Sequence, residues 1–518
     1  MLNSKHSYAS ANYWDTTNAT QFPEEGKSYI RNKEDLGIAF SGGGNRSAPL
    51  TLGYLRTLHK IGVLSKVKYI SAVSGGAWAS VPYTFLDSSI QDETFLGDYI
   101  APEDLDVNDI KNIGKSEYLT APANSEVIGH FFRNLLEGDE FFASILNKIF
   151  LTPFFIGNRK KLFTLDHEER DRIIANNKSL KKSDFYITKD NRPFLIVNAA
   201  VSRSFITEFS RFPLEITPLY TGVPKHFPNE GANGNLGLGG CYIESFAFDS
   251  DAPESIDTAN KSFTTRLNKE KKRFSLSDVI AATGSAPADI PIIGEIGFPE
   301  FKYWTVKDED NPKFRAKEYD VVDGGYLDNT GVLPLLSRKV SKIIAFINTN
   351  TEVQYEKEEI EISNMIQSFF LKVKDKLDRY DNNVCLTQNG KSNAEIVKGL
   401  KDKFYNLKKQ GLPLIITDNY QTMDNQLFGV VSGHSVEITW VHNSLNENWL
   451  EQIKDYDVKE TVLNEIENNN FPHYATFFEN SSDIIDLKNE QATLLAHLAS
   501  HTIMENVKLK GDQSPFSV

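Results

Sequence analysis

Short apolar runs alternate with amphipathic helical segments near the N-terminus of the chain. The continuous apolar run 36–40 predicts a buried strand, and a glycine-rich loop follows it. Apolar residues then recur at helical spacing over 47–61, and Gly62 ends this helix. A second predicted strand, 67–73, leads into a second helix near 77–86. This order of strand, helix, strand and helix predicts a doubly wound parallel sheet.

The rest of the chain adds further elements around two insertions. We predict strands or strand ends over 193–202, 321–325, 342–348 and 436–441, and helices over 275–288 and 489–505. The insertion at about 88–190 is mainly helical, and the insertion at 352–411 is charged and helical. We therefore expect one α/β domain over 35–518, preceded by an N-terminal arm, 1–34.

Composition narrows the possible functions. Hydrophobic residues make up 40% of the 518 positions and charged residues 24%, which suits a large buried core and not a disordered chain. The 56 basic and 70 acidic side chains give a net charge of −14, which argues against a nucleic-acid binder. Any contact with a membrane must then come from local basic patches or apolar surface.

The sequence also lacks three features that bear on location and chemistry: a cysteine framework, a secretion signal and a spanning helix. The only cysteines, Cys241 and Cys385, exclude a disulfide framework and a cysteine-rich metal site. Residues 1–20 are polar and lack the pattern of a secretion signal. No run reaches the ~18 uninterrupted apolar residues of a spanning helix. We expect a cytoplasmic protein.

The glycine loop is the first candidate for chemistry. Gly42, Gly43 and Gly44 lie between a strand and a helix, where backbone N–H groups can converge on an anion because no Cβ blocks the approach. The loop lacks the lysine of a phosphate-binding P-loop and the third glycine of a dinucleotide site. Taken alone, an ordinary structural turn explains it equally well.

The second candidate is a serine between a strand and a helix. Ala72-Val73-Ser74-Gly75-Gly76 places small residues around Ser74, as a nucleophile elbow requires for its sharp turn. Ala72 stands where the usual pattern has glycine. The alternative is that Ser74 is a simple helix N-cap.

The third candidate is Asp323, at the end of a strand and followed by Gly324 and Gly325. Active sites gather at this edge of an α/β sheet, so its carboxylate could take a proton from Ser74. An Asx turn is the alternative.

Together these motifs resemble the patatin-like and cytosolic phospholipase A acyl hydrolases. The similar segments are SGGGNRSA at 41–48, VSGG at 73–76, FPLEITP at 212–218, ATGSAPADIP at 282–291 and DGGYLDNTGVLPLL at 323–336. The resemblance covers roughly residues 35–350. It implies a three-layer α/β/α sheet with helical insertions and the hydrolysis of fatty acyl esters.

The resemblance also implies roles for individual residues. Ser74 would be the nucleophile of a Ser–Asp dyad that works without histidine, and Asp323 would be its base. Gly43 and Gly44, joined by Gly75, would donate the N–H groups of the oxyanion hole. The carboxylate is a weak base for a serine, so the dyad needs a desolvated site.

Arg46 matches the arginine of the family's glycine loop, which the resemblance places against a substrate phosphate. A guanidinium suits this role because it binds phosphate through two hydrogen bonds. A salt bridge at the helix start is the alternative. We therefore expect a phospholipid or lysophospholipid substrate, met at a membrane surface on which the protein binds peripherally and transiently. No cofactor is implied, and no motif for metal binding occurs.

Two other functions stay open. A general serine esterase or thioesterase would use a Ser–Asp–His triad, for which His434 is the best placed of the histidines after Asp323. A lipid-binding relative without catalysis would explain the departure at Ala72.

An aromatic stretch, 128–155, lies inside the first insertion and is followed by basic residues at 159–161. We expect a buried helical hairpin. The alternative is a lid that rests on lipid and lines the path of an acyl chain. A second basic run, 269–273, is either a further membrane contact or a solvated loop.

Overall fold

The computed structural model describes most of the chain. The described residues are 6–16, 21–111, 118–119, 140–202, 211–228, 237–268, 273–285, 299–304, 316–356, 359–373, 380, 382–475 and 487–517. Residues 128–139 of the predicted hairpin and four residues of the second basic run, 269–272, lie outside them.

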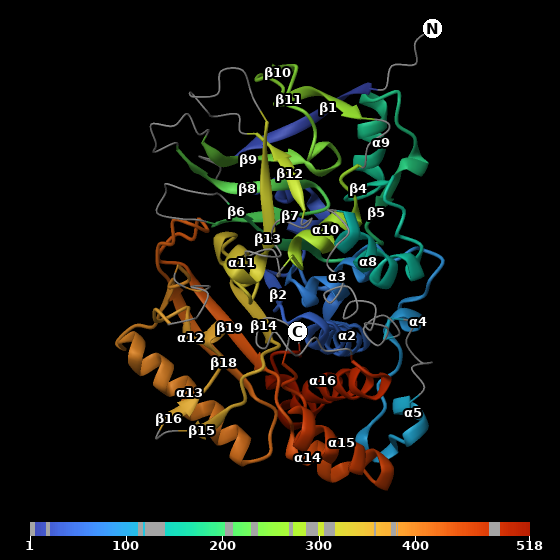
Figure 1. The fold of residues 1–518 in the computed structure, drawn as a ribbon. Helices are drawn as coiled ribbons and strands as arrows, with labels where there is room; N and C mark the ends of the chain where they lie inside the picture. The colour runs from blue at the N-terminus through green and yellow to red at the C-terminus, as the bar shows by residue number, and fades with distance from the viewer. Residues whose placement is uncertain are drawn as a thin grey trace.

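One large mixed sheet organises the molecule (Figure 1). Its parallel centre has the order β6-β3-β2-β14-β19, formed by Phe194–Ser202, Tyr69–Val73, Leu36–Phe40, Lys342–Ile347 and Ser435–His442. β2, β3 and most of β14 and β6 are buried along their length, as expected for strands covered on both faces. The predicted parallel sheet is confirmed.

Antiparallel strands extend the sheet on both sides. Beyond β6 come β7 (Arg211–Ile216), β8 (Tyr220–Phe227), β9 (Leu238–Glu244), β1 (His6–Asp15), β11 (Ser262–Asn268) and β10 (Ser255–Asp257). Beyond β19 come β18 (Ile415–Thr422) and β17 (Leu386–Thr387). β13 (Lys317–Asp323) pairs with β6 and with β12 (Glu300–Tyr303), off this path. Two small separate sheets pair β4 (Leu162–Thr164) with β5 (Phe185–Ile187) and β15 (Gln354–Glu356) with β16 (Glu359–Glu361).

Helices cover both faces of the parallel strands. The described helices are α1 (Ser28–Arg31), α2 (Gly44–Lys60), α3 (Gly75–Thr84), α4 (Asp92–Leu96), α5 (Val107–Lys111), α8 (Glu140–Phe150), α9 (His167–Asn176), α10 (Leu276–Thr283), α11 (Leu333–Ser337), α12 (Asn364–Gln367), α13 (Asn393–Lys409), α14 (Glu447–Gln452), α15 (Tyr456–Asn469) and α16 (Asn489–Lys510).

Two positions of β2 show the layering. Successive side chains of a strand point to opposite faces, so Gly37 and Phe40 face opposite layers. A Cβ at Gly37 would lie 2.9 Å from Leu335 of α11. Phe40 stacks on Phe346 of β14, which stacks in turn on Tyr54 of α2. With α2 on one face and α11 on the other, the predicted three-layer arrangement is confirmed.

The structure differs from the sequence-based prediction in three places. Residues 6–15 of the predicted arm form β1, which lies inside the sheet between β9 and β11. The insertion at 352–411 holds β15, β16 and β17 besides helices, because charged residues suit an exposed strand as well as a solvated helix face. The insertion at 88–190 contains β4 and β5.

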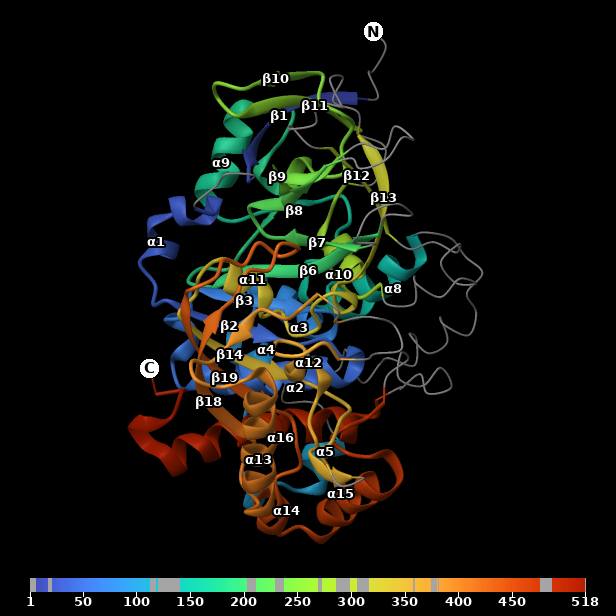
Figure 2. The ribbon, with the colours of Figure 1, turned by 90° about the vertical axis from the view of Figure 1, so that its left-hand side faces the viewer.

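The described part of the aromatic stretch is buried core. Phe150 of α8 packs against Trp78 of α3, with ring centroids 5.1 Å apart, and Phe154 packs against Phe95 at 5.0 Å. Phe155 is the exception, with 68% of its surface exposed. Figure 2 shows α8 beside α10 on the flank of the sheet. For the described residues, the prediction of buried packing is confirmed.

Candidate active site

Ser74 occupies a strained turn between β3 and α3. Its φ of 49° and ψ of −125° lie outside the regions that side chains favour, at a cost of about 1–3 kcal/mol. The next residue, Gly75, approaches the glycine loop so closely that a Cβ there would lie 2.1 Å from the carbonyl oxygen of Gly44. A Cβ at Gly76 would lie 2.7 Å from the carbonyl oxygen of Phe40. The sequence Ser-Gly-Gly is therefore needed to hold the serine in this turn.

A hydroxyl from α10 holds the backbone of the turn. The amide of Ser74 donates to Thr283 Oγ1 at 2.8 Å, and Thr283 Oγ1 donates to the carbonyl of Asn198 at 2.6 Å. The Asn198 side chain donates to Ser71 Oγ and to the carbonyl of Ala72, at 2.9 and 3.1 Å. Thr283 and Asn198 thus connect β3, β6 and α10 at the base of the turn. Neither was singled out by sequence reasoning.

The glycine loop lies beside this turn, at the N-terminus of α2. Gly43 has a φ of 136° and Gly44 a φ of 48°, conformations that L side chains rarely adopt. The backbone N–H groups of Gly43, Gly44 and Gly75 donate to no described residue. Gly44 begins α2 and Gly75 begins α3, so the positive ends of two helix dipoles point to the same region. This arrangement can stabilise a negatively charged oxygen.

Asp323 ends β13, where it lies opposite Ala199 of β6. Its side chain is 4% exposed, and its carboxylate accepts a hydrogen bond from the Gly325 amide at 2.7 Å. Its own amide donates to the carbonyl of Ser285 at 3.3 Å, just beyond α10. The same helix end therefore supports the backbones of both Ser74 and Asp323.

The side chain of Asn329 lies close to both candidate catalytic residues. A Cβ at Gly42 would lie 3.1 Å from Ser74 Cβ and 2.1 Å from Asn329 Oδ1. A Cβ at Gly325 would lie 2.7 Å from the same Oδ1 and 3.1 Å from Asp323 Oδ1. Ser74 and Asp323 thus lie in one region, near the same amide. In the sequence, Asn329 stands out only as part of the similar segment 323–336.

Ser74 and Asp323 are not hydrogen-bonded to each other in this structure. Among the described residues, Ser74 makes hydrogen bonds only through its backbone, so its Oγ is free. The side chain is 6% exposed. Catalytic hydrogen bonds are often long or absent without substrate, so this geometry leaves the dyad open as a hypothesis.

Asp328 is a second buried carboxylate, in the loop that follows Asp323, and its environment differs from that of Asp323. It accepts hydrogen bonds from the Thr330 amide, the Thr330 hydroxyl and the Leu333 amide, at 2.9, 2.5 and 2.9 Å. Burial raises its pKa above the ordinary value, against the effect of these hydrogen bonds. These bonds fix the loop that leads into α11, which gives Asp328 a structural role.

Arg46 is buried at the start of α2, with 2% of its surface exposed. Its Nη1 donates to the carbonyl of Tyr474, and its Nε and Nη2 donate to the carbonyl of Asn348, at 3.3 and 3.1 Å. The guanidinium also lies under Gly43, where a Cβ would be 2.9 Å from Nη2. In this structure Arg46 therefore braces the glycine loop through backbone carbonyls.

The hydrogen bonds of the C-terminal histidines go to residues other than Ser74. Nδ1 of His442 and of His473 lies against the backbone carbonyls of Asn443 and Thr349, at 2.8 and 3.0 Å. Burial lowers the pKa of His442 to about 3 and that of His473 to about 4, so both rings are neutral at pH 7.

His497 and His501 contact the segment before α5, where Nδ1 of His501 lies 3.0 Å from Tyr99 Oη. Nε2 of His434 is buried without a hydrogen bond to any described residue, so it is not paired with Ser74. The described part of the chain thus offers Ser74 no histidine partner.

The described ranges hold no group of three or more His, Cys, Asp or Glu side chains arranged to bind a metal ion. Within the same ranges, the helices are all too short or too polar to cross a membrane.

Comparison with known proteins gives the family. The model of the patatin-like phospholipase family matches residues 38–336, which include the glycine loop, Ser74 and Asp323. No curated protein matches the chain in sequence.

Some solved structures are similar to the chain at low identity. Human GIVD cytosolic phospholipase A2 is 12% identical with a TM-score of 0.39, over 95% of this chain and 62% of that chain. The structure of its complex with methyl gamma-linolenyl fluorophosphonate and terbium chloride is 11% identical with a TM-score of 0.40. That match covers 94% of this chain and 60% of that chain. VipD from Legionella pneumophila is 12% identical with a TM-score of 0.17, over 57% of this chain and 46% of that chain. The chain thus spans less than two thirds of the phospholipase structures that it matches.

The match covers more than half of the chain and includes every motif that suggested the resemblance. The sheet, with helices on both faces and the serine turn at its edge, is a patatin-like fold. This chain belongs to the patatin-like phospholipase family.

Proposed function

We propose that this protein hydrolyses fatty acyl esters of phospholipids or lysophospholipids through a Ser74–Asp323 dyad and an acyl-enzyme. The observation that carries the proposal is the convergence of three free N–H groups, from Gly43, Gly44 and Gly75, beside a serine in a strained turn. Such donors stabilise the negative oxygen that forms when a nucleophile attacks an ester carbonyl.

The reaction follows from these positions. Ser74 Oγ bonds to the carbonyl carbon while its proton passes to the carboxylate of Asp323, and the carbonyl oxygen becomes an oxyanion. The bond to the glycerol oxygen then breaks, and this oxygen takes the proton. Water attacks the acyl-enzyme in the second half-reaction and gives its proton to Asp323. The bond between Ser74 Oγ and the acyl carbon then breaks, Oγ takes the proton from Asp323, and the fatty acid leaves. Because Ser74 Oγ makes no hydrogen bond to a described residue, it is available for a contact with Asp323 when substrate binds.

The substrate class is the finer part of the proposal. A phosphate contact by Arg46 remains a prediction, and it requires the guanidinium to release the carbonyl of Tyr474. The substrate lies in a bilayer or micelle, so the protein meets that surface peripherally and transiently. A cytoplasmic location also remains a prediction.

A fluorophosphonate label tests the nucleophile. We expect the wild-type protein and the surface control Ser89→Ala to be labelled, and Ser74→Ala to remain unlabelled. Equal labelling of Ser74→Ala would reject Ser74 as the nucleophile.

A lipid panel tests the substrate class. We expect the wild-type protein to release fatty acid from a phospholipid or lysophospholipid, and Ser74→Ala to release none. If the wild-type protein acts only on soluble esters or thioesters, the phospholipid assignment is wrong. If Arg46→Gln lowers kcat/KM for phospholipid and for neutral glyceride by the same factor, Arg46 does not contact the phosphate.

A further inference from the structure

A cavity of about 350 Å³ lies in the antiparallel half of the sheet. Its walls come from the end of β1, the start of the 3-10 helix η1 (Pro23–Gly26), β8, β9, the residues after α11 and the segment 428–431. None of the candidate catalytic residues lines it. Its volume is in the range of pockets that hold small organic molecules.

Four aromatic side chains form the apolar walls of the cavity: Trp14, Phe22, Tyr242 and Phe428. Two of these rings are held from behind. The Arg338 guanidinium lies 3.9 Å from the centroid of Phe22, and the Tyr242 hydroxyl donates to Glu215 at 2.7 Å. The walls are therefore built before any ligand arrives. Flat aromatic faces of this kind favour stacking with a planar ring.

Three lysines, Lys225, Lys261 and Lys339, line the same cavity. Within the described ranges, the ammonium groups of these lysines have no salt-bridge or hydrogen-bond partner. The only carboxylate among the lining residues is Asp15, which leaves the lining with a net positive charge. The stem of Lys225 is placed by close packing, since a Cβ at Gly429 would lie 2.6 Å from its Cε. In a protein with a net charge of −14, this is a local site for an anion.

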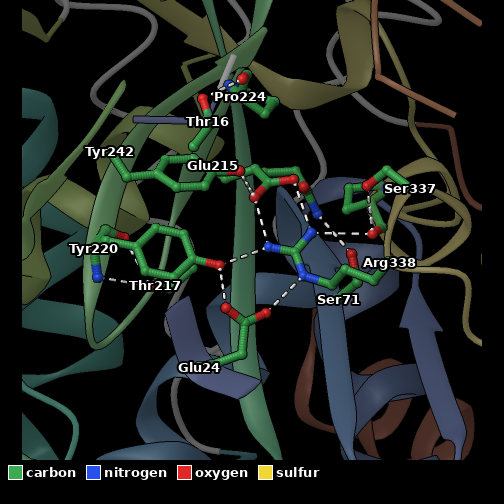
Figure 3. Close-up of polar contacts among 12 residues, drawn as sticks. Thr16, Glu24, Ser71, Glu215, Thr217, Tyr220, Pro224, Tyr242, Ser337 and Arg338 are labelled. Atoms are coloured by element: carbon green, nitrogen blue, oxygen red, sulfur yellow. Dashed lines mark hydrogen bonds and ion pairs between the residues drawn. The ribbon is translucent and has the colours of Figure 1, made fainter. Parts of the chain in front are cut away.

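The charges beneath the cavity do not compete for that anion. Figure 3 shows Arg338 between Glu24, Glu215 and the Tyr220 hydroxyl, below Tyr242 and beside Ser337. Arg338 donates to Glu24 at 2.9 Å and to Glu215 at 2.7 Å, and its side chain is fully buried. Its charge is already matched, so a ligand in the cavity would depend on the three lysines for its counter-charge.

We propose that this cavity binds a small aromatic organic phosphate, with the ring stacked between the aromatic walls and the phosphate held by Lys225, Lys261 and Lys339. Phosphate is favoured because it can accept hydrogen bonds from more than one ammonium group at once. The site is separate from the one that performs ester hydrolysis, and its occupant is not the lipid substrate.

Calorimetric titration of the full chain with 1-naphthyl phosphate tests the site. We expect binding that is stronger than that of 1-naphthol or inorganic phosphate, because each lacks one half of the recognised group. The double variant Lys225→Gln/Lys339→Gln should bind about tenfold or more weakly, since it removes two charge-assisted contacts. Lys178→Gln/Lys454→Gln makes the same change in net charge at exposed lysines elsewhere and should bind as the wild-type protein does.

Three results would overturn the proposal. The first is no binding of 1-naphthyl phosphate to the wild-type protein, or equal binding to the Lys225/Lys339 variant. The second is equal affinity for inorganic phosphate, which would leave the aromatic walls without a role. The third is loss of binding after a fluorophosphonate has blocked Ser74, which would place the probe in the catalytic site. Ester hydrolysis by the Lys225/Lys339 variant should stay unchanged, which separates this proposal from the proposed function.

Discussion

The molecule has two buried polar centres, one in each half of the sheet, and they use polar groups in opposite ways. At the edge of the parallel half, Ser74 Oγ and three glycine N–H groups are left without partners among the described residues. In the antiparallel half, Arg338 is matched by Glu24, Glu215 and Tyr220. Groups that are already paired stabilise a fold, whereas unpaired donors and a free nucleophile are available to a substrate.

The surroundings of the two centres differ in the same sense. Around Ser74 the backbone adopts strained conformations, with positive φ at Ser74, Gly43 and Gly44. The Arg338 cluster instead joins β7, β8, η1 and the end of α11 through side chains. Burial raises the pKa of Glu24, and the Arg338 charge opposes this shift. We infer that the strained backbone around Ser74 lowers the stability of the fold in return for reactive groups, and that the Arg338 cluster contributes to stability alone.

The largest effect should come from Asp323→Asn. The amide oxygen can still accept the Gly325 hydrogen bond, so the fold should be retained, but the base is lost. We expect a loss of about 10⁴-fold in kcat, as for other catalytic groups of serine hydrolases. Steady-state hydrolysis and thermal unfolding, measured in parallel, check this. Full activity in Asp323→Asn would rule out the dyad.

Arg338→Met should give the reverse result. It leaves Glu24 and Glu215 buried without a counter-charge, which should lower the free energy of unfolding by about 3–5 kcal/mol. Activity per folded molecule should change little. Urea unfolding checks the first part, with Lys398→Met as the control, since its exposed pair with Asp402 contributes at most about 0.5 kcal/mol. A stable Arg338→Met protein with reduced turnover would break the comparison.

Glu244 should give the antiparallel half a measurable pH dependence. Burial raises its pKa to about 7, although Arg172 pairs with it. The folded state then holds a proton that the unfolded state releases above pH 4.5, so stability falls as the pH rises from about 4.5 to 7. At about 1.4 kcal/mol per pKa unit the loss is about 3–4 kcal/mol. The decline should be smaller in Glu244→Gln, because Glu24 and Asp328 still contribute to it; a parallel decline in both proteins would contradict the assignment.

Thr283→Val should have a smaller effect, both on stability and on turnover. The change keeps the shape of the side chain but removes the acceptor for the Ser74 amide and the donor to Asn198. We expect a loss of about 1–3 kcal/mol in stability from the buried polar groups left without partners. We also expect kcat to fall while KM stays the same, because the turn loses its support. Thr283→Ser should restore both, and a fall in stability alone would give Thr283 a purely structural role.

His434→Asn should leave hydrolysis unchanged. Its Nε2 makes no hydrogen bond to a described residue, and the other C-terminal histidines are bonded elsewhere. A loss of activity with intact folding would favour a triad over the dyad.

The parallel half of the fold was predictable because its signals are local. Mostly apolar runs such as 36–40 and 67–73 occur where a strand is covered on both faces, and glycines mark the turns that need positive φ. Ser74 follows such a strand, whereas Asp323 ends β13, which is partly exposed. Their approach to one another could be inferred only through the family resemblance, since 249 positions separate them.

The rest depends on contacts that no local pattern marks. Thr283 and Asn329 reach the site through the packing of a helix end and a loop, and neither residue type signals this by itself. Glu24, Glu215 and Arg338 look like ordinary surface charges until β7 and α11 are placed side by side. Short strands such as Glu359–Glu361 carry charges that suit a solvated helix equally well.

The packing of α2 against α16 has a consequence for synthesis of the chain. α2 is covered by α16, residues 489–510. A Cβ at Gly53 of α2 would lie 2.2 Å from the carbonyl of Ala496, and the Ser500 hydroxyl donates to the Gly53 carbonyl at 2.9 Å. At about 5–20 residues per second, the ribosome needs about half a minute or more to add the intervening residues. Throughout that interval the face of α2 that packs on α16 lacks this cover.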